Sequence, residues 1–299
     1  MLKTKEYRIT QTVAHIVCMI FFACALLPFL LMVIASFTDN AWAGRYGFTF
    51  FPAEWSTSAY RYIVVKWNLI GRAYLMTLLV TAAGTSISLV ITTLFAYGIS
   101  KSRIPGMKFV SFLLIFTMLF NGGIVSTYYC YVKFWQVKDT IWALILPNML
   151  MNAFSVILVR NYFVTSIPAS LEEAARIDGA GSFRIFARIV IPLSKPIVAT
   201  IGLMTGLGYW NDWMNGYIYL TKRTDLYSIQ NLLNRMIQNI QFLMQNSSTI
   251  SNANQGLASI PSVSVRMAMA VVGVLPIVIV YPFIQNNFVK GITLGGVKG

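Results

Sequence analysis

Charged residues are scarce in this chain of 299 residues. Only 11% of its residues are charged and 57% are hydrophobic, with nine acidic residues against 23 lysines and arginines. Soluble globular domains carry about 25% charged residues, so this composition leaves too little polar surface for a soluble globule. The mean hydropathy of +0.67 also indicates a chain that is too apolar for a soluble globule. We therefore expect a protein that lies in a lipid membrane.

Groups that catalyse reactions or bind metals are also few. His15 is the only histidine, and the three cysteines show no metal-binding spacing. The sequence has no G-x-x-x-x-G-K-[ST] loop, which would cradle the phosphates of ATP, and no Ser/His/Asp or Cys/His set with a choice of bases. We predict a non-catalytic chain that binds no metal and no cofactor of its own.

Six long apolar stretches are present instead. Each supplies the roughly 20 residues that a bilayer core requires. They are longer than the strands of a membrane barrel and do not alternate, so helices are the structures that satisfy their backbone groups in lipid. The sequence predicts an all-α membrane protein of one domain with six transmembrane helices, at residues 12–37, 73–99, 109–129, 140–160, 196–220 and 264–288.

The basic residues indicate how these helices are oriented. With a cytoplasmic N-terminus, the inner segments hold more than half of the 23 basic residues, although they are shorter than the outer ones. We predict that both termini are cytoplasmic. The net charge of +14 is explained by anionic lipid headgroups, and no nucleic-acid partner is expected.

The inner connection between the fourth and fifth spans, residues 165–196, has the signals of a short surface helix. Ser170 and Glu173 fit an S-x-x-E capping box, which predicts that the helix begins at Ser170. Glu172 and Glu173 then suit the positive end of the helix dipole. On this spacing alone, an ordinary solvated loop is an equal alternative.

Two glycines indicate where this helix ends. Gly179 and Gly181 are stop residues that tolerate positive φ. A second helical pattern begins at Ser182 and reaches Pro192 and Pro196, which are expected to redirect the chain into the fifth span.

The same segment resembles the EAA signature of permease subunits in binding-protein-dependent ABC importers. The resemblance rests on Glu173-Ala-Ala175, on Asp178-Gly-Ala180, and on Ile189-Val-Ile-Pro192 after nine intervening residues that follow Gly179. Ile191 stands where leucine is commoner, which is a conservative departure.

Four further stretches extend the resemblance over nearly the whole chain. They look like the carbohydrate branch of the family, which includes maltose permeases, and within it the lipo-oligosaccharide and complex-glycan subgroup. These stretches are Asp139 to Pro147, Arg160 to Phe163, Tyr281 to Phe283 and Val289 to Gly299.

The resemblance implies a type I ABC importer permease that translocates a sugar or oligosaccharide across a bacterial plasma membrane. It implies a second permease in a heterodimer, two ATPase subunits that bind ATP and Mg²⁺, and an extracellular sugar-binding lipoprotein. It also implies that residues 165–196 hold a cytoplasmic coupling helix seated in a cleft of the ATPase. The implied coupling residues are Ser170, Glu172, Glu173, Ala174, Ala175, Asp178, Gly179, Ala180 and Pro192.

The C-terminal tail, residues 289–299, has two interpretations. By resemblance, Gly296 and Lys298 contact the ATPase. In the alternative, the tail is disordered and Lys298 reaches the lipid headgroups.

Polar residues inside the spans are costly in lipid and therefore mark a candidate substrate path. Amide and carboxylate groups beside aromatic faces suit the binding of a sugar. Contacts that hold helices together are the alternative interpretation, and we favour it slightly. The candidates are Asn121, Asn148, Asn152, Trp210, Asn211, Asp212 and Trp213.

The outer connection at residues 221–263 predicts an amphipathic helix followed by a polar loop rich in Ser, Asn and Gln. This connection lies at the membrane–water interface or contacts the extracellular binding protein. For the whole chain, the alternative is a secondary transporter or channel without an ATPase partner. We find no internal repeat, and Asp212 is the only acidic residue well inside a span, both of which disfavour that alternative.

Overall fold

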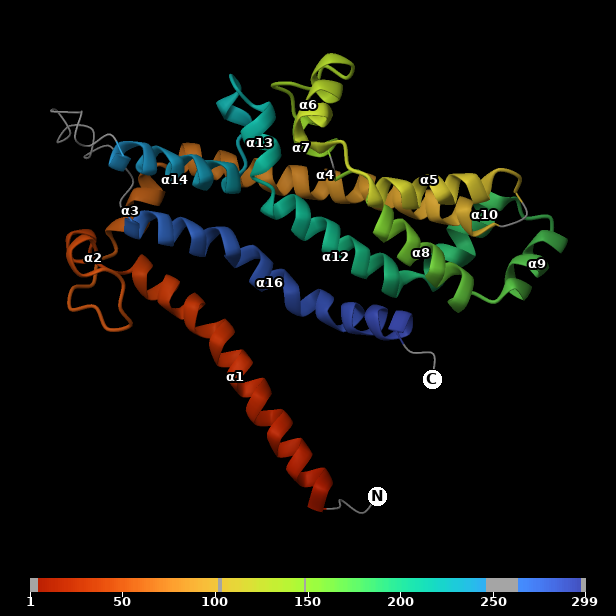
Figure 1. The fold of residues 1–299 in the computed structure, drawn as a ribbon, viewed down its shortest axis with the longest axis horizontal. Coiled ribbons are helices and arrows are strands. Elements are labelled where there is room, and N and C mark those ends of the chain that lie inside the picture. Colours follow the sequence, from red (N-terminus) through yellow and green to blue (C-terminus); the bar gives the residue numbers. More distant parts are fainter. Residues whose placement is uncertain (1–4, 102–103, 148, 246–262, 297–299) are drawn as a thin grey trace. The chain divides into compact units, whose positions relative to one another are not determined.

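The computed structural model describes residues 5–101, 104–147, 149–245 and 263–296, and almost all of them are helical (Figure 1). Their only extended pairing is an isolated bridge between Thr38 and Trp55. Three helices are long: α1 (Lys5–Ser36), α4 (Trp67–Ser100) and α16 (Val263–Gly296). The all-α prediction is confirmed.

Several helices are suited to crossing a membrane. Among the described residues, three are long and apolar enough by themselves, at Ile9–Ser36, Trp67–Ser100 and Val263–Pro282. Three further pairs of helices pass the same test but bend sharply, and the number becomes six if each pair is one span. Six is also the number of predicted spans, but the limits differ, because the pair Ala153–Ser166 and Ala169–Ile177 includes part of the predicted inner connection.

The predicted third span is broken in the middle. Residues 109–129 fall on α5 (Met107–Leu119) and α6 (Gly123–Lys133), which meet at 120°. Gly123 has a φ of +78°, which glycine tolerates and other residues rarely adopt. Asn121 Oδ1 accepts a hydrogen bond from the Gly123 N–H at 2.8 Å. The apolar run therefore continues through a turn.

The predicted fourth span is not one helix either. Residues 140–160 contain α7 (Trp142–Ile145) and the start of α8 (Ala153–Ser166). Pro147 lies between them, and proline cannot donate to a helical hydrogen bond.

The predicted fifth span is divided as well. Residues 196–220 contain α12 (Lys195–Asn211) and α13 (Met214–Tyr219), with Asp212 and Trp213 at the break. The helix that follows each of these three breaks receives a side-chain hydrogen-bond acceptor at its N-terminus, from Asn121, Asn152 and Asp212 respectively. Hydropathy averaged over a window does not detect such breaks.

The chain forms two compact units. The first consists of residues 1–70 and 235–275, and the second of residues 71–234 and 276–299. In the first unit, α1 is followed by α2 (Asn40–Tyr46) and α3 (Ser58–Val65). Most of the apolar side chains along α1 are exposed, and only those near its C-terminal end are covered.

Polar contacts order the connections of the first unit. Asp39 Oδ1 caps α2 by accepting the N–H groups of Ala41 at 2.8 Å and Trp42 at 3.2 Å. The hydroxyls of Ser36 and Tyr60 lie 2.8 Å apart and join α1 to α3.

The second unit contains the main hydrophobic core. Helices α4, α5, α8 and α12 share it with α10 (Ser182–Ile185), the π-helical turn η1 (Phe186–Val190) and α11 (Ile191–Leu193). Fully or almost fully buried aliphatic side chains form its centre: Val156, Val159, Ile185, Val190 and Ile201.

One glycine sets how closely two helices of this unit approach. A Cβ atom added to Gly84 in α4 would lie 2.5 Å from Cζ of Tyr209 in α12. The Tyr209 hydroxyl donates a hydrogen bond to the carbonyl oxygen of Ile145 at 2.9 Å. The buried Tyr209 ring therefore packs directly on the α4 backbone.

The amphipathic helix expected in the outer connection is present as α14 (Ile229–Gln245), after a 3₁₀ turn, η2 (Thr224–Leu226). The Ile229 N–H donates to Thr77 Oγ1 at 2.9 Å, and Ile229 is fully buried. The polar run of residues 246–262 lies outside the described residues.

Candidate functional site

The short helix between α8 and α12 is α9 (Ala169–Ile177), which follows α8 at a bend of 77° (Figure 1). It begins one residue earlier than predicted. Pro168 is the N-cap, and no side chain caps the helix. The predicted capping box is therefore wrong. Ser170 lies inside the first turn, whereas a capping hydroxyl must come from the N-cap residue itself.

The C-terminus of α9 is closed by a Schellman motif. The Ala180 N–H donates to the Ala175 carbonyl oxygen at 2.9 Å, and the Gly179 N–H donates to the Arg176 carbonyl oxygen at 3.0 Å. Gly179 has a φ of +79°, as expected for a stop residue. Gly181 does not share this role, because its φ is −70° and it is the N-cap of α10. Asp178 is the C-cap residue of α9 and is exposed.

The implied coupling residues of α9 divide between two faces. Glu173 and Ala174 are exposed. Ala175 and Ala180 are partly buried and pack against the core of the second unit. Glu172 also faces this unit and forms an ion pair with Lys101. Of the two signature alanines, Ala174 is therefore exposed and Ala175 is partly buried.

Three apolar side chains around α9 are exposed, and the sequence reasoning did not identify them as surface residues. The exposed fractions are 44% for Leu171, 87% for Ile177 and 75% for Phe183. Exposed apolar groups of this size mark a contact surface for a protein or a membrane. A sequence signal existed, because Leu171 and Ile177 are the large apolar residues of a short, otherwise small or charged helix.

Pro192 lies in α11, beside the bend that leads into α12. The helical stretch Ser182–Leu193 meets Lys195–Asn211 at 82°. The predicted change of direction near Pro192 and Pro196 is present.

The candidate substrate-path residues do not gather into one site. Trp210 lines a cavity of about 770 Å³ between α4, α12 and the Pro276–Tyr281 stretch of α16, together with Thr81 and Thr85. Asn211 is exposed, and its Nδ2 donates to the Leu207 carbonyl oxygen at 3.0 Å. Asn148 lies outside the described residues.

The other polar candidates interact with backbone groups at helix starts. Asn152 Oδ1 accepts the Ser155 N–H at 3.1 Å and caps α8. Asp212 Oδ1 accepts the N–H groups of Met214 at 3.1 Å and Asn215 at 3.2 Å at the start of α13. Asn121 has the similar role already described before α6. These contacts are local helix caps between residues two or three positions apart in the sequence, a role that neither sequence interpretation predicted.

Trp213 is partly exposed, at 38%, and its ring centroid lies 6.1 Å from that of Tyr217. For the tail, Gly296 is the last residue of α16, and Lys298 lies outside the described residues.

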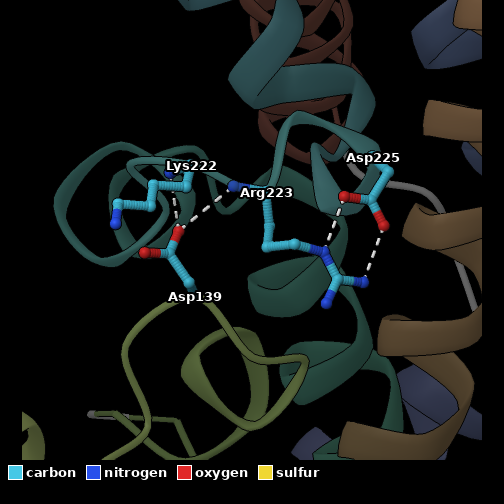
Figure 2. A network of polar contacts seen from close by, with 4 residues as sticks. All are labelled: Asp139, Lys222, Arg223 and Asp225. Atoms are coloured by element: carbon cyan, nitrogen blue, oxygen red, sulfur yellow. Dashed lines mark hydrogen bonds and ion pairs between the residues drawn. The ribbon is translucent and has the colours of Figure 1, made fainter.

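Asp139 joins the loop before α7 to the loop after α13 (Figure 2). Its Oδ1 accepts the N–H groups of Thr221 and Lys222 at 2.8 Å and of Arg223 at 3.2 Å. Its Oδ2 accepts the Thr221 hydroxyl at 2.9 Å. These donors, with the Lys222 N–H contributing most, hold the pKa of the Asp139 carboxyl well below its usual range.

Arg223 continues this network. Its Nε and Nη2 donate to the two carboxylate oxygens of Asp225 at 2.8 and 2.7 Å (Figure 2). Asp139 is also the first residue of a stretch that carried the sequence resemblance, and the geometry gives that aspartate a structural role.

Residues 104–294, from the connection before α5 to the last turn of α16, match the family described as binding-protein-dependent transport system inner membrane component. The chain belongs to this family. The match includes α9, and the family resemblance stated from the sequence is confirmed. The chain is an ABC transporter permease, a non-catalytic membrane component.

Relatives of this permease match it over nearly its whole length. The polygalacturonan/rhamnogalacturonan transport system permease protein YtcP of Bacillus subtilis (strain 168) is 40% identical over 281 residues, which cover 94% of this chain and 95% of YtcP. Protein LplC of the same organism is 35% identical over 277 residues, covering 93% of this chain and 90% of LplC.

A solved structure is similar as well. It is the crystal structure of a bacterial ABC transporter involved in the import of the acidic polysaccharide alginate. The matching chain has a TM-score of 0.80 and 30% sequence identity, and the match covers 95% of this permease and 98% of that chain.

Proposed function

We propose that this permease is one transmembrane subunit of an ATP-driven importer, and that it translocates a sugar or oligosaccharide delivered by an extracellular binding protein. The carbohydrate substrate is supported by the names of its relatives, which include a polygalacturonan/rhamnogalacturonan permease and an alginate importer. The observation that carries the proposal is the construction of α9. It is a short, closed helix that packs on the core through one face and exposes charged and apolar groups on the other.

In this proposal, α9 is the cytoplasmic coupling helix. A separate ATPase binds ATP and Mg²⁺ and contacts the exposed Glu173 and Ala174, with Ile177 and Phe183 adding apolar area. A rigid helix transmits the closure of the ATPase to the spans, whereas a flexible loop would absorb it. The Schellman motif at Gly179 supplies part of that rigidity.

The remaining parts of the assembly follow from the same proposal. A second permease completes the transmembrane pair, and both termini of this chain face the cytoplasm. The tail after α16 reaches the ATPase. Trp210 and the cavity that it lines in the second unit provide a candidate part of the sugar path.

The test is to purify the permease from its native host with the proteins that accompany it, and to measure ATP hydrolysis and sugar uptake in proteoliposomes. We expect an ATPase to copurify and its hydrolysis to rise when the sugar-loaded binding protein is added. Gly179→Val should keep the assembly intact but reduce uptake per ATP hydrolysed. A β-branched residue at a φ of +79° is strained by about 1–2 kcal/mol and opens the end of α9.

Gly181→Ser is the matched control, because Gly181 has a φ of −70°, a Cβ there meets nothing within 4 Å, and serine is a good N-cap. This variant should behave like the unchanged protein. Uptake that proceeds without any associated ATPase would refute the importer and favour a secondary transporter. An unchanged ratio of uptake to ATP hydrolysis in Gly179→Val would show that α9 does not transmit the movement of the ATPase.

A further inference from the structure

An ion pair connects the coupling helix to the end of α4. Lys101 directly follows α4, and its Nζ pairs with the carboxylate of Glu172 in the first turn of α9. The two side chains are only 23% and 15% exposed. A pair that is largely removed from water is less screened than a surface pair. The sequence reasoning gave Glu172 a role at the helix dipole and gave Lys101 no role.

The same ammonium group also contacts an aromatic ring. Lys101 Nζ lies 4.5 Å from the ring centroid of Tyr97, one turn earlier in the chain at the end of α4. A cation over an aromatic face is attracted by the ring quadrupole, so the lysine is held from two sides.

Tyr97 in turn belongs to the core of the second unit. Its ring centroid is 5.1 Å from that of Phe186 in η1 and 6.4 Å from that of Phe163 in α8. Phe186 and Phe163 are buried. Contacts therefore run without interruption from Glu172, through Lys101 and Tyr97, to the segments on either side of α9 in the sequence.

We infer that the Lys101–Glu172 pair is a positioning contact that makes α9 move as one body with the cytoplasmic end of α4. This inference rests on the proposed function and deepens it. By chain connectivity alone, α9 would pass its movement to α8 and α12. The ion pair also transmits this movement to α4, although 71 residues separate its two partners in the sequence. Lys101 and Glu172 are then positioning residues and need not touch the ATPase or the sugar.

A charge exchange in the purified assembly tests this inference. Lys101→Glu and Glu172→Lys each place like charges together, so we expect sugar uptake per ATP hydrolysed to fall by about fivefold or more, the lower end of usual coupling effects. The double variant Lys101→Glu with Glu172→Lys restores an ion pair, and we expect the ratio to return to within about twofold of the unchanged protein. Lys101→Arg keeps the charge and should also retain coupling.

Lys108→Glu is the matched control. Lys108 is the second residue of α5 and is exposed, and its replacement by glutamate makes the same change in net charge as Lys101→Glu. This variant should leave the ratio unchanged, which separates loss of the pair from a general change in charge near the membrane.

A cross-link gives a second and independent readout. In a protein whose native cysteines are replaced by serine, Lys101→Cys with Glu172→Cys is joined by a short flexible bis-maleimide. Before cross-linking this variant lacks the ion pair, so its uptake per ATP hydrolysed should be reduced. If α9 and the end of α4 move together, the cross-link replaces the pair and should restore this ratio towards that of the cysteine-free protein. If they move apart during the cycle, the cross-link blocks uptake and the inference is overturned.

These outcomes distinguish the proposed function from the positioning role of the Lys101–Glu172 pair. An assembly without an ATPase would refute the proposed function. An assembly that couples normally, but in which Lys101→Glu behaves like Lys108→Glu, would leave that function standing and overturn the positioning role. Failure of the double variant to recover, when both single variants are uncoupled, would also overturn it.

Discussion

At the scale of single residues, polar side chains in the apolar segments mainly satisfy backbone groups. Asn121, Asn152 and Asp212 each accept a backbone N–H where a helix is interrupted. Unpaired backbone donors are costly away from water, so an interruption needs such a residue. The sequence could show that these residues are unusual in a span. It could not show whether they face a substrate or a backbone, because both uses require the same side chains.

Asp139 gives a pH prediction at this scale. Its pKa is lowered in the folded protein, so its contribution to stability is complete above the unfolded value of about 3.9 and is lost as the pH falls through the lower folded value. Asp139→Asn removes the charge that strengthens these hydrogen bonds. We expect it to lower stability by roughly 1 kcal/mol, because the group is largely exposed.

The measurement is the thermal midpoint in detergent at several pH values. The midpoint of the unchanged protein should exceed that of Asp139→Asn by a constant amount between pH 8 and pH 5, and the difference should begin to shrink as the pH falls below about 4. Asp225→Asn offers a comparison within the same network, because it removes a carboxylate but leaves the three backbone donors to Asp139 in place. A difference that grows as the pH falls would contradict the assigned role of Asp139.

At the scale of helices, the long elements could be predicted and their interruptions could not. Helices α1, α4 and α16 are long apolar runs, and α14 has a clear amphipathic pattern. Hydropathy reports whether a segment prefers lipid. It does not report where the chain turns within it. Those turns depend on single residues such as Gly123 and Pro147, whose effects disappear in an average over a window.

The contact between α4 and α12 gives a prediction at this scale. Gly84→Ala places a Cβ 2.5 Å from the buried ring of Tyr209, and neither helix can move without disturbing the core. We expect a loss of about 1–3 kcal/mol, as for overpacked cores. The measurement is the thermal midpoint of the purified protein.

Gly98→Ala is the control within the same helix, because a Cβ at Gly98 meets nothing within 4 Å. Alanine is the better helix former, so this variant should be neutral or more stable by about 0.5–1 kcal/mol. Equal midpoints for the two variants would mean that the close approach at Tyr209 does not limit the packing of α12.

At the scale of the whole molecule, many of the large apolar side chains are not buried within the chain. Helix α1 has an 18-residue apolar window, none of which is buried within the described structure. Its exposed side must be covered by lipid or by another subunit, since water would disfavour it. The family and the helical fold could be predicted from the sequence because composition and the EAA spacing involve many residues. The Lys101–Glu172 contact could not, because it depends on how α9 folds back on the core.

Orientation is the prediction at this scale. In a protein without its native cysteines, Arg61→Cys in α3 should react with a membrane-impermeant maleimide in intact cells. Lys108→Cys at the start of α5 should react only after the cells are permeabilised. Both positions are exposed, so burial does not explain a difference between them. Labelling in the reverse order would place the termini outside.

The π-helical turn at Phe186–Val190 has a consequence for how this protein tolerates changes in length. Its hydrogen bonds span one residue more than those of an α-helix, so removal of one residue within it could be absorbed as a regular helix without breaking the chain. The wide turn holds its extra residue by widening, so the segments on either side would keep nearly the same rotational phase about the axis. The same deletion in the regular helix α12 would rotate everything before it by about 100°, at 3.6 residues per turn. A single-residue deletion at Phe186–Val190 would thus leave the surface that α9 presents in its original direction, whereas a deletion in α12 would turn it away.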